Sequence, residues 1–395
     1  MRTFLLLPLL VMSACQSPED QSPAERARDL ASEAIIVDGH IDVPYRMTVW
    51  EEDVTESTYG GDFDYPRARE GGLDAPFMSI YIPADLQGQP EKTAALADSL
   101  IDLVEAIADK APDRFAVAKT VEDVRTNHAR GVISLPMGME NGAPIADNPD
   151  LLGHFFDRGI RYITLTHGKD NGLSDSSYDT TATWGGLSPL GKDVVAQMNS
   201  LGIMVDISHL SDAAASDVLE ISTAPVIASH SSVRVFTPGW ERNMSDDLIR
   251  ALASKGGLIM INYGSSFLRS EYQAQGEAVQ EAIEARITEQ GLEGEEANRA
   301  RADLRRAAPV GTLNDVVAHI NHVRDLVGTG HIGLGSDYDG VFALPAGLQD
   351  VSTYPALIQA LLEEGYTEDS VRDILGENLL RVWADVERIE RETAG

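Results

Sequence analysis

Residues 203–209 read Ile-Met-Val-Asp-Ile-Ser-His, an uninterrupted apolar run that ends in polar side chains. A strand that is apolar on both faces is typical of a parallel sheet covered by helices. A helix-like segment over 187–200 precedes it, which gives this part of the chain the alternation of an α/β protein. Polar residues just after such a strand stand where barrel enzymes place their active sites.

The same unit recurs along the chain. Apolar runs predict eight strands, at 35–37, 78–82, 132–135, 162–165, 203–206, 226–228, 258–261 and 332–334. Helical patterns such as 91–109 and 313–327 separate most of them. Eight βα units predict an α/β fold, a closed (β/α)8 TIM-type barrel. Residues 354–392 predict amphipathic C-terminal helices that close the barrel.

One segment departs from this alternation. Residues 270–307, between the seventh and eighth predicted strands, are long, charged and helix-favouring. They predict a helical insertion over the barrel mouth. Three interpretations stay open: a lid, a contact between the subunits of a homodimer, or a solvated insertion without a role.

The first residues carry the pattern of an export signal. Arg2 precedes a short apolar run over 4–12, and small residues precede Cys15, the chain's only cysteine. This pattern predicts a signal peptide over 1–14, too short to span a bilayer. The small-small-Cys ending resembles a bacterial lipoprotein signal, in which Cys15 is lipidated. An ordinary cleaved signal with a bystander cysteine is the alternative.

The N-terminal pattern predicts how the chain is divided into segments and where the protein is located. Residues 15–32 are expected to be a lipid-anchored tether, and 33–395 a single barrel domain. The protein is expected to be an exported lipoprotein facing the periplasm, touching the membrane only through its anchor. The charge, 31 Lys+Arg against 63 Asp+Glu for a net −32, disfavours nucleic acid as a partner.

Imidazoles and carboxylates follow several of the predicted strands. His40 and Asp42 are two apart in extended chain, so they point to the same side and can hold one ion together. Glu140 follows the third predicted strand, and a carboxylate can bridge two ions about 3.5–4 Å apart. His209 and His230, on adjacent strands, could hold the second ion. These are ligands that suit Zn²⁺.

An ordered series of motifs identifies a family resemblance. The chain resembles the membrane (renal-type) dipeptidases of peptidase family M19, in the amidohydrolase superfamily, over roughly 33–385. The matching stretches are VDGHIDVPYR at 37–46, GVISLPMGMENG at 131–142, YITLTH at 162–167, VDISHLS at 205–211, APVIASHSS at 224–232, ERNMSDD at 241–247 and HIGLGSDYDG at 331–340.

The resemblance implies a binuclear metal-dependent dipeptidase with two divalent ions, zinc by expectation. It places His40, Asp42 and Glu140 on one metal, and Glu140, His209 and His230 on the other. It also implies that His167, Arg242 and Asp337 contact the substrate or move protons. The chain departs from the family at Asn141, where Glu-Gly-Gly is common, and around Arg242, which is displaced by a residue; Arg234 is the alternative.

The expected chemistry is hydrolysis of dipeptides by a hydroxide bridging the two metals. His167 would stabilise the oxyanion, Asp337 would carry the proton to the leaving amine, and Arg242 would bind the free carboxylate. An N-acyl-amino-acid deacylase or a lactam hydrolase could use the same site. A peptide-binding lipoprotein without catalysis is a further alternative.

The remaining candidates are expected to be structural. His319 and His322 lie three apart on a predicted helix outside the barrel, where a surface role is expected. His128, His154 and His331 lie before strands or in helices. Lys169 lies beyond a strand end, and Glu140 already supplies the bridge that a modified lysine would provide.

Overall fold

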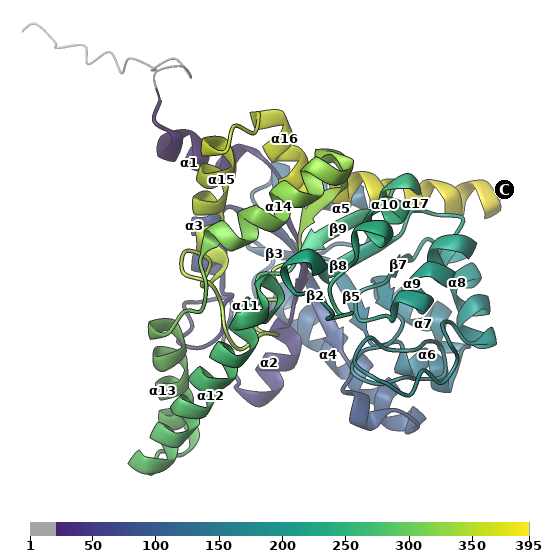
Figure 1. Cartoon of the computed structure of the whole chain (residues 1–395), viewed down its shortest axis with the longest axis horizontal. Coiled ribbons are helices and arrows are strands. Elements are labelled where there is room, and N and C mark those ends of the chain that lie inside the picture. Colours follow the sequence, from purple (N-terminus) through teal and green to yellow (C-terminus); the bar gives the residue numbers. More distant parts are fainter. Residues whose placement is uncertain (1–20, 395) are drawn as a thin grey trace, which may run out of the picture.

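The computed structural model describes residues 21–394, and their core is a closed barrel of eight parallel strands (Figure 1). The order around the barrel is β1-β10-β9-β8-β7-β6-β5-β2. The strands are β1 (Ile36–Ile41), β2 (Leu73–Tyr81), β5 (Met137–Glu140), β6 (Ile160–Thr164), β7 (Met204–Asp206), β8 (Ile227–Ser231), β9 (Leu258–Ile261) and β10 (Ile332–Leu334). The predicted (β/α)8 barrel is confirmed.

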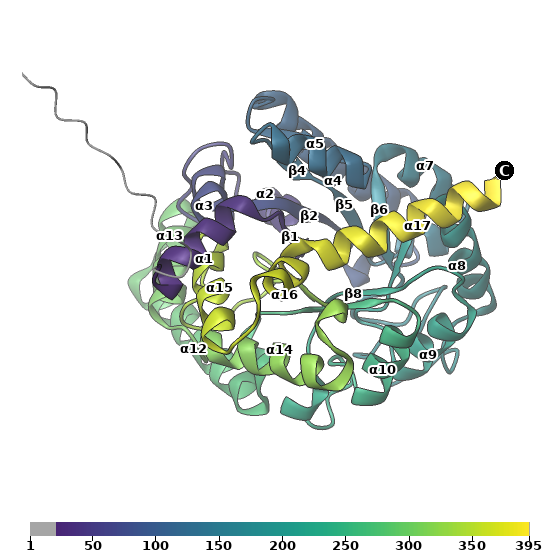
Figure 2. The ribbon, with the colours of Figure 1, turned by 90° about the horizontal axis from the view of Figure 1, so that it is seen from above.

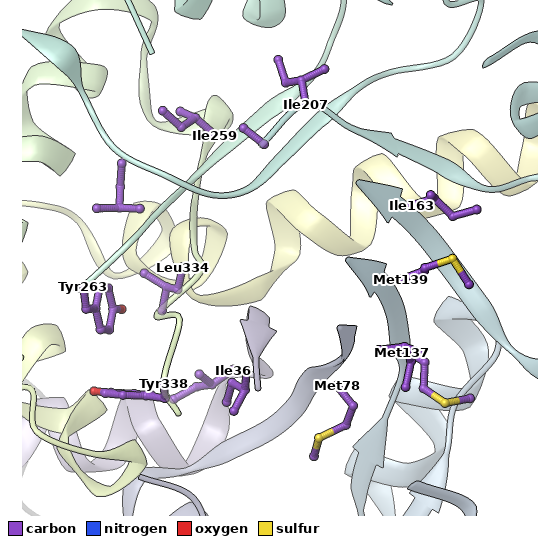
Figure 3. Packing of buried hydrophobic residues seen from close by; sticks show 14 of the residues in the cluster. Ile36, Met78, Met137, Met139, Ile163, Ile207, Ile259, Tyr263, Leu334 and Tyr338 are labelled. Carbon is purple, nitrogen blue, oxygen red and sulfur yellow. The ribbon is translucent and has the colours of Figure 1, made fainter. Parts of the chain in front are cut away.

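Helices surround the barrel on the outside. They are α1 (Pro23–Glu33), α2 (Val43–Val49), α3 (Tyr65–Gly71), α4 (Pro90–Lys110), α5 (Val121–Ala129), α6 (Ala143–Asp147), α7 (Leu151–Arg158), α8 (Pro189–Leu201), α9 (Asp212–Ile221), α10 (Asp246–Ser254), α11 (Ser265–Leu268), α12 (Ser270–Gln290), α13 (Gly294–Ala307), α14 (Leu313–Val327), α15 (Tyr354–Glu363), α16 (Glu368–Arg372) and α17 (Asn378–Ala394). Apolar side chains of the strands and of most of these helices form a large buried cluster, part of which is drawn in Figure 3. A second cluster joins other strand side chains to α17. No helix within 21–394 is long and apolar enough to cross a membrane.

One predicted barrel strand is wrong. The run at 132–135 becomes β4 (Ile133–Leu135), which pairs with β3 (Phe115–Val117) in a separate two-stranded parallel sheet. Pro136, which has no N–H to donate, ends β4, and the barrel strand begins one residue later as β5. Gly138 weakens the strand signal of β5 in the sequence. The barrel needs it, because a Cβ there would lie 2.0 Å from the Tyr162 ring.

The folded part begins earlier than residue 33. Ser22 and Glu25 form a reciprocal capping box that starts α1. This helix buries Ala27, Leu30 and Ala31 and packs against α15. The stretch predicted as tether up to residue 32 is therefore helical and packed from Pro23 onward. The predicted signal peptide and Cys15 lie outside the described residues.

The two ends of the barrel are different. The C-terminal helix α17 lies across the end where the strands begin (Figure 2), with Trp383 against Phe77 at a ring distance of 5.3 Å. This confirms that the C-terminal helices close the barrel. Polar strand ends gather at the opposite end. Beside that end, α12 and α13 form a hairpin that projects from the barrel (Figure 1). This hairpin is the helical insertion that the sequence predicts over 270–307.

Candidate metal centre and active site

The strand ends bring the predicted ligands into one buried cluster. His40 lies in β1, Asp42 follows it, Glu140 ends β5, His209 follows β7 and His230 lies in β8. Each of the five is at most 7% exposed. Parallel strands of a barrel present their carboxyl ends to a single site, which explains how residues 190 positions apart in the chain meet.

Glu140 lies at the centre of the cluster, with its two oxygens facing different histidines. Its Oε2 lies 3.4 Å from Nε2 of His40. Its Oε1 lies 3.1 Å from Nε2 of His209 and 3.4 Å from Nε2 of His230. A carboxylate arranged in this way can contact two cations at once.

Two carboxylates adjoin the His40 half of the cluster. Asp42 Oδ2 lies 3.3 Å from His40 Nε2. Ligand atoms of His40, Asp42 and Asp337 all lie within 4.8 Å of one another. The Asn262 amide donates to Asp337 Oδ2 at 2.7 Å and holds that side chain in place.

The donor set fits divalent cations. Nε2 of His40 is buried and has no hydrogen-bond partner among the described residues. A buried polar atom without a partner costs free energy, and a cation would remove that cost. Nε2 of His209 and of His230 point to the same place, 2.8 Å apart. Imidazole nitrogens with shared carboxylate oxygens are ligands for zinc and similar ions.

The electrostatics keep three of the proposed ligands, Glu140, His209 and His230, in the form that binds a metal. Burial works to raise the pKa of Glu140, but His40 and His167 hold it well below its usual range, so the bridge is ionised. Burial lowers the pKa of His209, and the Arg242 charge lowers it further. Burial likewise holds the pKa of His230 well below its usual value. Both imidazoles are therefore neutral at neutral pH, the form that binds a metal.

Hydrogen bonds behind the ligands orient two of the imidazoles. Nδ1 of His40 lies 2.7 Å from the Tyr162 hydroxyl. Nδ1 of His230 lies 2.7 Å from the hydroxyl of Ser229, which itself donates to Asp206 at 2.6 Å. In both rings these contacts leave Nε2 directed at Glu140. Partners of this kind fix the tautomer and orientation of metal-binding histidines.

Four residues at the site have left-handed backbone. They are Asn141 (φ 75°), His209 (φ 68°), Asp337 (φ 63°) and Asp339 (φ 66°). This conformation is rare outside glycine and costs least for Asn and Asp. It explains why Asn141 can stand where the family often has glycine.

The three predicted substrate residues also lie at the cluster. Nε2 of His167 is 3.6 Å from Glu140 Oε1, and burial lowers the pKa of His167. Arg242 is 2% exposed, and its Nη2 lies 3.0 Å from His209 Nε2. Arg234, the alternative to Arg242, is engaged elsewhere in a two-point ion pair with Asp212, its Nη1 donating to Oδ2 at 2.6 Å.

The cluster opens into a catalytic cavity of about 380 Å³. Its walls include four aromatic side chains that were not predicted from the sequence, namely Tyr45, Tyr81, Tyr178 and Phe267. Tyr81 ends β2 and could have been found by reading that strand end like the others. Tyr178 lies in a loop and Phe267 in the short helix α11, where no periodic pattern marks a residue as facing the site.

The other histidines lie away from this cavity, but the surface role expected for His319 is wrong. His319 is fully buried: the Val233 N–H donates to its Nδ1 at 3.0 Å, and its Nε2 lies 3.0 Å from the Leu268 carbonyl. It therefore ties α14 to the loop that follows His230. His322 is partly exposed and lies 2.8 Å from Asp246. Lys169 is exposed and pairs with Asp85 at 2.5 Å.

The buried His319 predicts a loss of stability in acid. Burial lowers its pKa to about 4, while the unfolded chain protonates near its ordinary value of about 6.5. Between pH 4 and pH 6.5 the unfolded state binds more protons than the folded state. The contribution of neutral His319 to the free energy of unfolding is therefore complete above pH 6.5 and is lost as the pH falls towards 4. This difference corresponds to about 3 kcal/mol. We expect His319→Gln, which hydrogen-bonds but cannot be protonated there, to flatten this part of the pH profile in urea titrations. An unchanged profile would contradict the assignment.

The barrel, with buried imidazoles and carboxylates at its strand ends, defines a metal-dependent hydrolase of the amidohydrolase type. Comparison with known proteins makes this specific. The membrane dipeptidase family (peptidase family M19) matches residues 24–395, and the chain belongs to it. The protein is accordingly a metallopeptidase of that family.

Individual relatives agree with this assignment. The dipeptidase verJ of Clonostachys rogersoniana is 32% identical over 378 residues, covering 92% of this chain and 87% of the relative. A metallopeptidase from Rhodobacter sphaeroides, solved with a phosphinate mimic of the dipeptide L-Ala-D-Ala, is 27% identical with a TM-score of 0.73, covering 90% and 100% of the two chains. The probable dipeptidase PvdM from Pseudomonas aeruginosa shares the fold, with 24% identity, a TM-score of 0.80 and coverage of 94% and 100%.

Proposed function

We propose that this enzyme is a binuclear dipeptidase in which Glu140 joins two divalent ions, zinc in the simplest case. His40 and Asp42 would complete one site, and His209 and His230 the other. The observation that carries the proposal is the placement of the Glu140 carboxylate. Its Oε2 faces His40, while its Oε1 faces His209 and His230. Two ions bound here would supply Lewis acidity, which lowers the pKa of water between them to about 7 in zinc enzymes.

The protein side chains supply the other parts of the reaction. His167 lines the catalytic cavity beside Glu140, and as a neutral imidazole it would donate a hydrogen bond to the carbonyl oxygen as negative charge develops there. Asp337 also lines the cavity, and its carboxylate would take the proton from the attacking water and give it to the leaving amine. The carbonyl carbon of the substrate would thus become tetrahedral between His167 as hydrogen-bond donor and Asp337 as base.

Arg242 would make the enzyme selective for dipeptides. A guanidinium forms two parallel hydrogen bonds with a carboxylate, and the free carboxylate of a dipeptide lies close to the scissile bond. In longer peptides the next peptide bond takes that place. The relative solved with a mimic of L-Ala-D-Ala supports a ligand of dipeptide size.

A panel of substrates tests the proposal. Metal-loaded protein should hydrolyse free dipeptides, and much more slowly their N-acylated counterparts, with two ions per chain by metal analysis. Equal rates on blocked and free substrates would instead indicate a deacylase. A single ion per chain in fully active protein would exclude the binuclear centre.

Substitution of Arg242 tests the carboxylate contact. A charge-assisted hydrogen bond is worth about 1.5–3 kcal/mol, so Arg242→Ala should lower kcat/KM for dipeptides by about 10- to 100-fold. Dipeptide amides, which lack the carboxylate, should scarcely change. Arg242→Lys should restore only part of the activity, because a point charge cannot form the fork.

Arg234→Ala is the matched control for Arg242. It removes a guanidinium that is paired with Asp212 outside the catalytic cavity, so both substrate classes should respond alike. If Arg242→Ala also affected dipeptides and their amides equally, Arg242 would be structural.

A further inference from the structure

A second cavity adjoins the catalytic one. It has a volume of about 450 Å³ and lies between α12 and the segment that follows Asp339. The two cavities share Gly340 and Val341 as walls. Its outer wall is the first half of α12, the helix that leaves the barrel mouth beside α11 (Figure 1).

The lining of this second cavity combines aromatic rings with the polar side chains of Ser266, Gln273 and Gln280. Trp240, Tyr272 and Phe342 contribute rings, and Glu277 is its one charged residue among the lining side chains. Tyr272 directs its hydroxyl to Asp315 at 3.3 Å and contributes its ring to the lining. Flat apolar walls suit an aromatic side chain, which buries a large area on entry. The carboxylate of Glu277 disfavours an anionic one.

A chain of ring contacts connects this cavity to Arg242. The Arg242 guanidinium lies 4.9 Å from the centre of the Phe267 ring. Phe267, which also lines the catalytic cavity, lies 5.0 Å from the ring of Trp240. The second cavity therefore begins on the side of the site where Arg242 would hold the substrate carboxylate.

We propose that the second cavity receives the side chain of the C-terminal residue of the dipeptide, and favours large aromatic side chains over acidic ones. This inference rests on the proposed dipeptidase function and on Arg242 as its carboxylate contact. The N-terminal residue would stay among Tyr45, Tyr81 and the carboxylates of the catalytic cavity. The insertion would thus act as a wall of the specificity pocket.

Gly276→Leu tests the proposal by filling the cavity. Gly276 lies within α12 and lines the cavity, and a Cβ there would meet only Ala343 Cβ, at an ordinary 3.6 Å. Leucine also favours a helix more than glycine does, so the variant should fold. We expect kcat/KM for Ala-Trp and Ala-Tyr to fall at least tenfold, mainly through KM, with Ala-Gly changed less than twofold.

Two further variants complete the experiment. Ala278→Leu places the same leucine side chain at an exposed position of α12 outside the cavity, and should leave the kinetics on all substrates unchanged. Glu277→Gln should raise kcat/KM for Ala-Glu several-fold relative to Ala-Gln, because it removes the repelling charge.

The outcomes separate this inference from the proposed function. Wild-type protein that hydrolyses no dipeptide would overturn the dipeptidase proposal itself. Active protein in which Gly276→Leu lowers Ala-Gly and Ala-Trp equally, or neither, would overturn the role of the cavity. If Gly276→Leu lowered kcat/KM selectively for Trp-Ala rather than for Ala-Trp, the cavity would bind the side chain of the N-terminal residue. That result would also overturn the inference.

Discussion

Glu140→Gln is expected to abolish dipeptide hydrolysis by preventing both ions from binding. A neutral amide offers one weak oxygen donor where the carboxylate offers two charged ones, and Glu140 faces His40 and His209 with different oxygens. Loss of an outer-shell partner typically costs 10- to 100-fold in affinity, so loss of a shared ligand should cost more. Metal analysis after dialysis should find less than one ion per chain.

The control for this variant is Glu387→Gln. Glu387 lies on α17 at the closed end of the barrel, where it accepts the Val121 N–H at 3.0 Å. The substitution removes a partly buried carboxylate far from the cavity, and metal content and activity should stay at wild-type levels. A Glu140→Gln protein that kept two ions through dialysis would refute the bridging role.

The Asp337→Asn variant is expected to bind both ions but to have a much lower kcat. Asparagine can still accept the hydrogen bond from Asn262, so the side chain should stay in place. It cannot take up a proton, and removal of a positioned general base typically lowers kcat by roughly 10²-fold or more. Steady-state kinetics together with metal analysis check both parts of this expectation.

Asp339→Asn serves as the comparison in the same turn. Asp339 also lines the cavity, but its oxygens bind Arg46 at 3.1 Å and the Asp62 N–H at 2.6 Å. Its substitution should lower stability and change kcat far less. If Asp337→Asn retained full activity, the proton would have to pass through another group, with His167 a candidate.

The sequence predicts the barrel well because its strands are buried on both faces. The runs at 203–205 and 258–261 are apolar throughout; the first overlaps β7 and the second coincides with β9. The third strand was misplaced because Met137–Glu140 contains glycine and methionine, whereas 132–135 has the stronger strand composition. The register was decided by the fit of Gly138 against Tyr162, a contact between different strands that no local pattern contains.

The cluster could be predicted because each of its residues lies near the carboxyl end of a strand or just after it. The second cavity could not be, since Trp240, Tyr272 and Phe342 come from three separate segments after β8, β9 and β10. The burial of His319 was also hidden, because its partners Val233 and Leu268 are distant in sequence. Helix periodicity alone does not distinguish a buried polar side chain from an exposed one.

The left-handed residues at the strand ends have an evolutionary consequence. Asp337, at φ 63°, occupies a conformation that costs an ordinary side chain roughly 1–2 kcal/mol. Substitution of this position by glycine would relieve that strain while it removes the proposed general base. Loss of the proposed base at this turn is therefore compatible with retention of the fold.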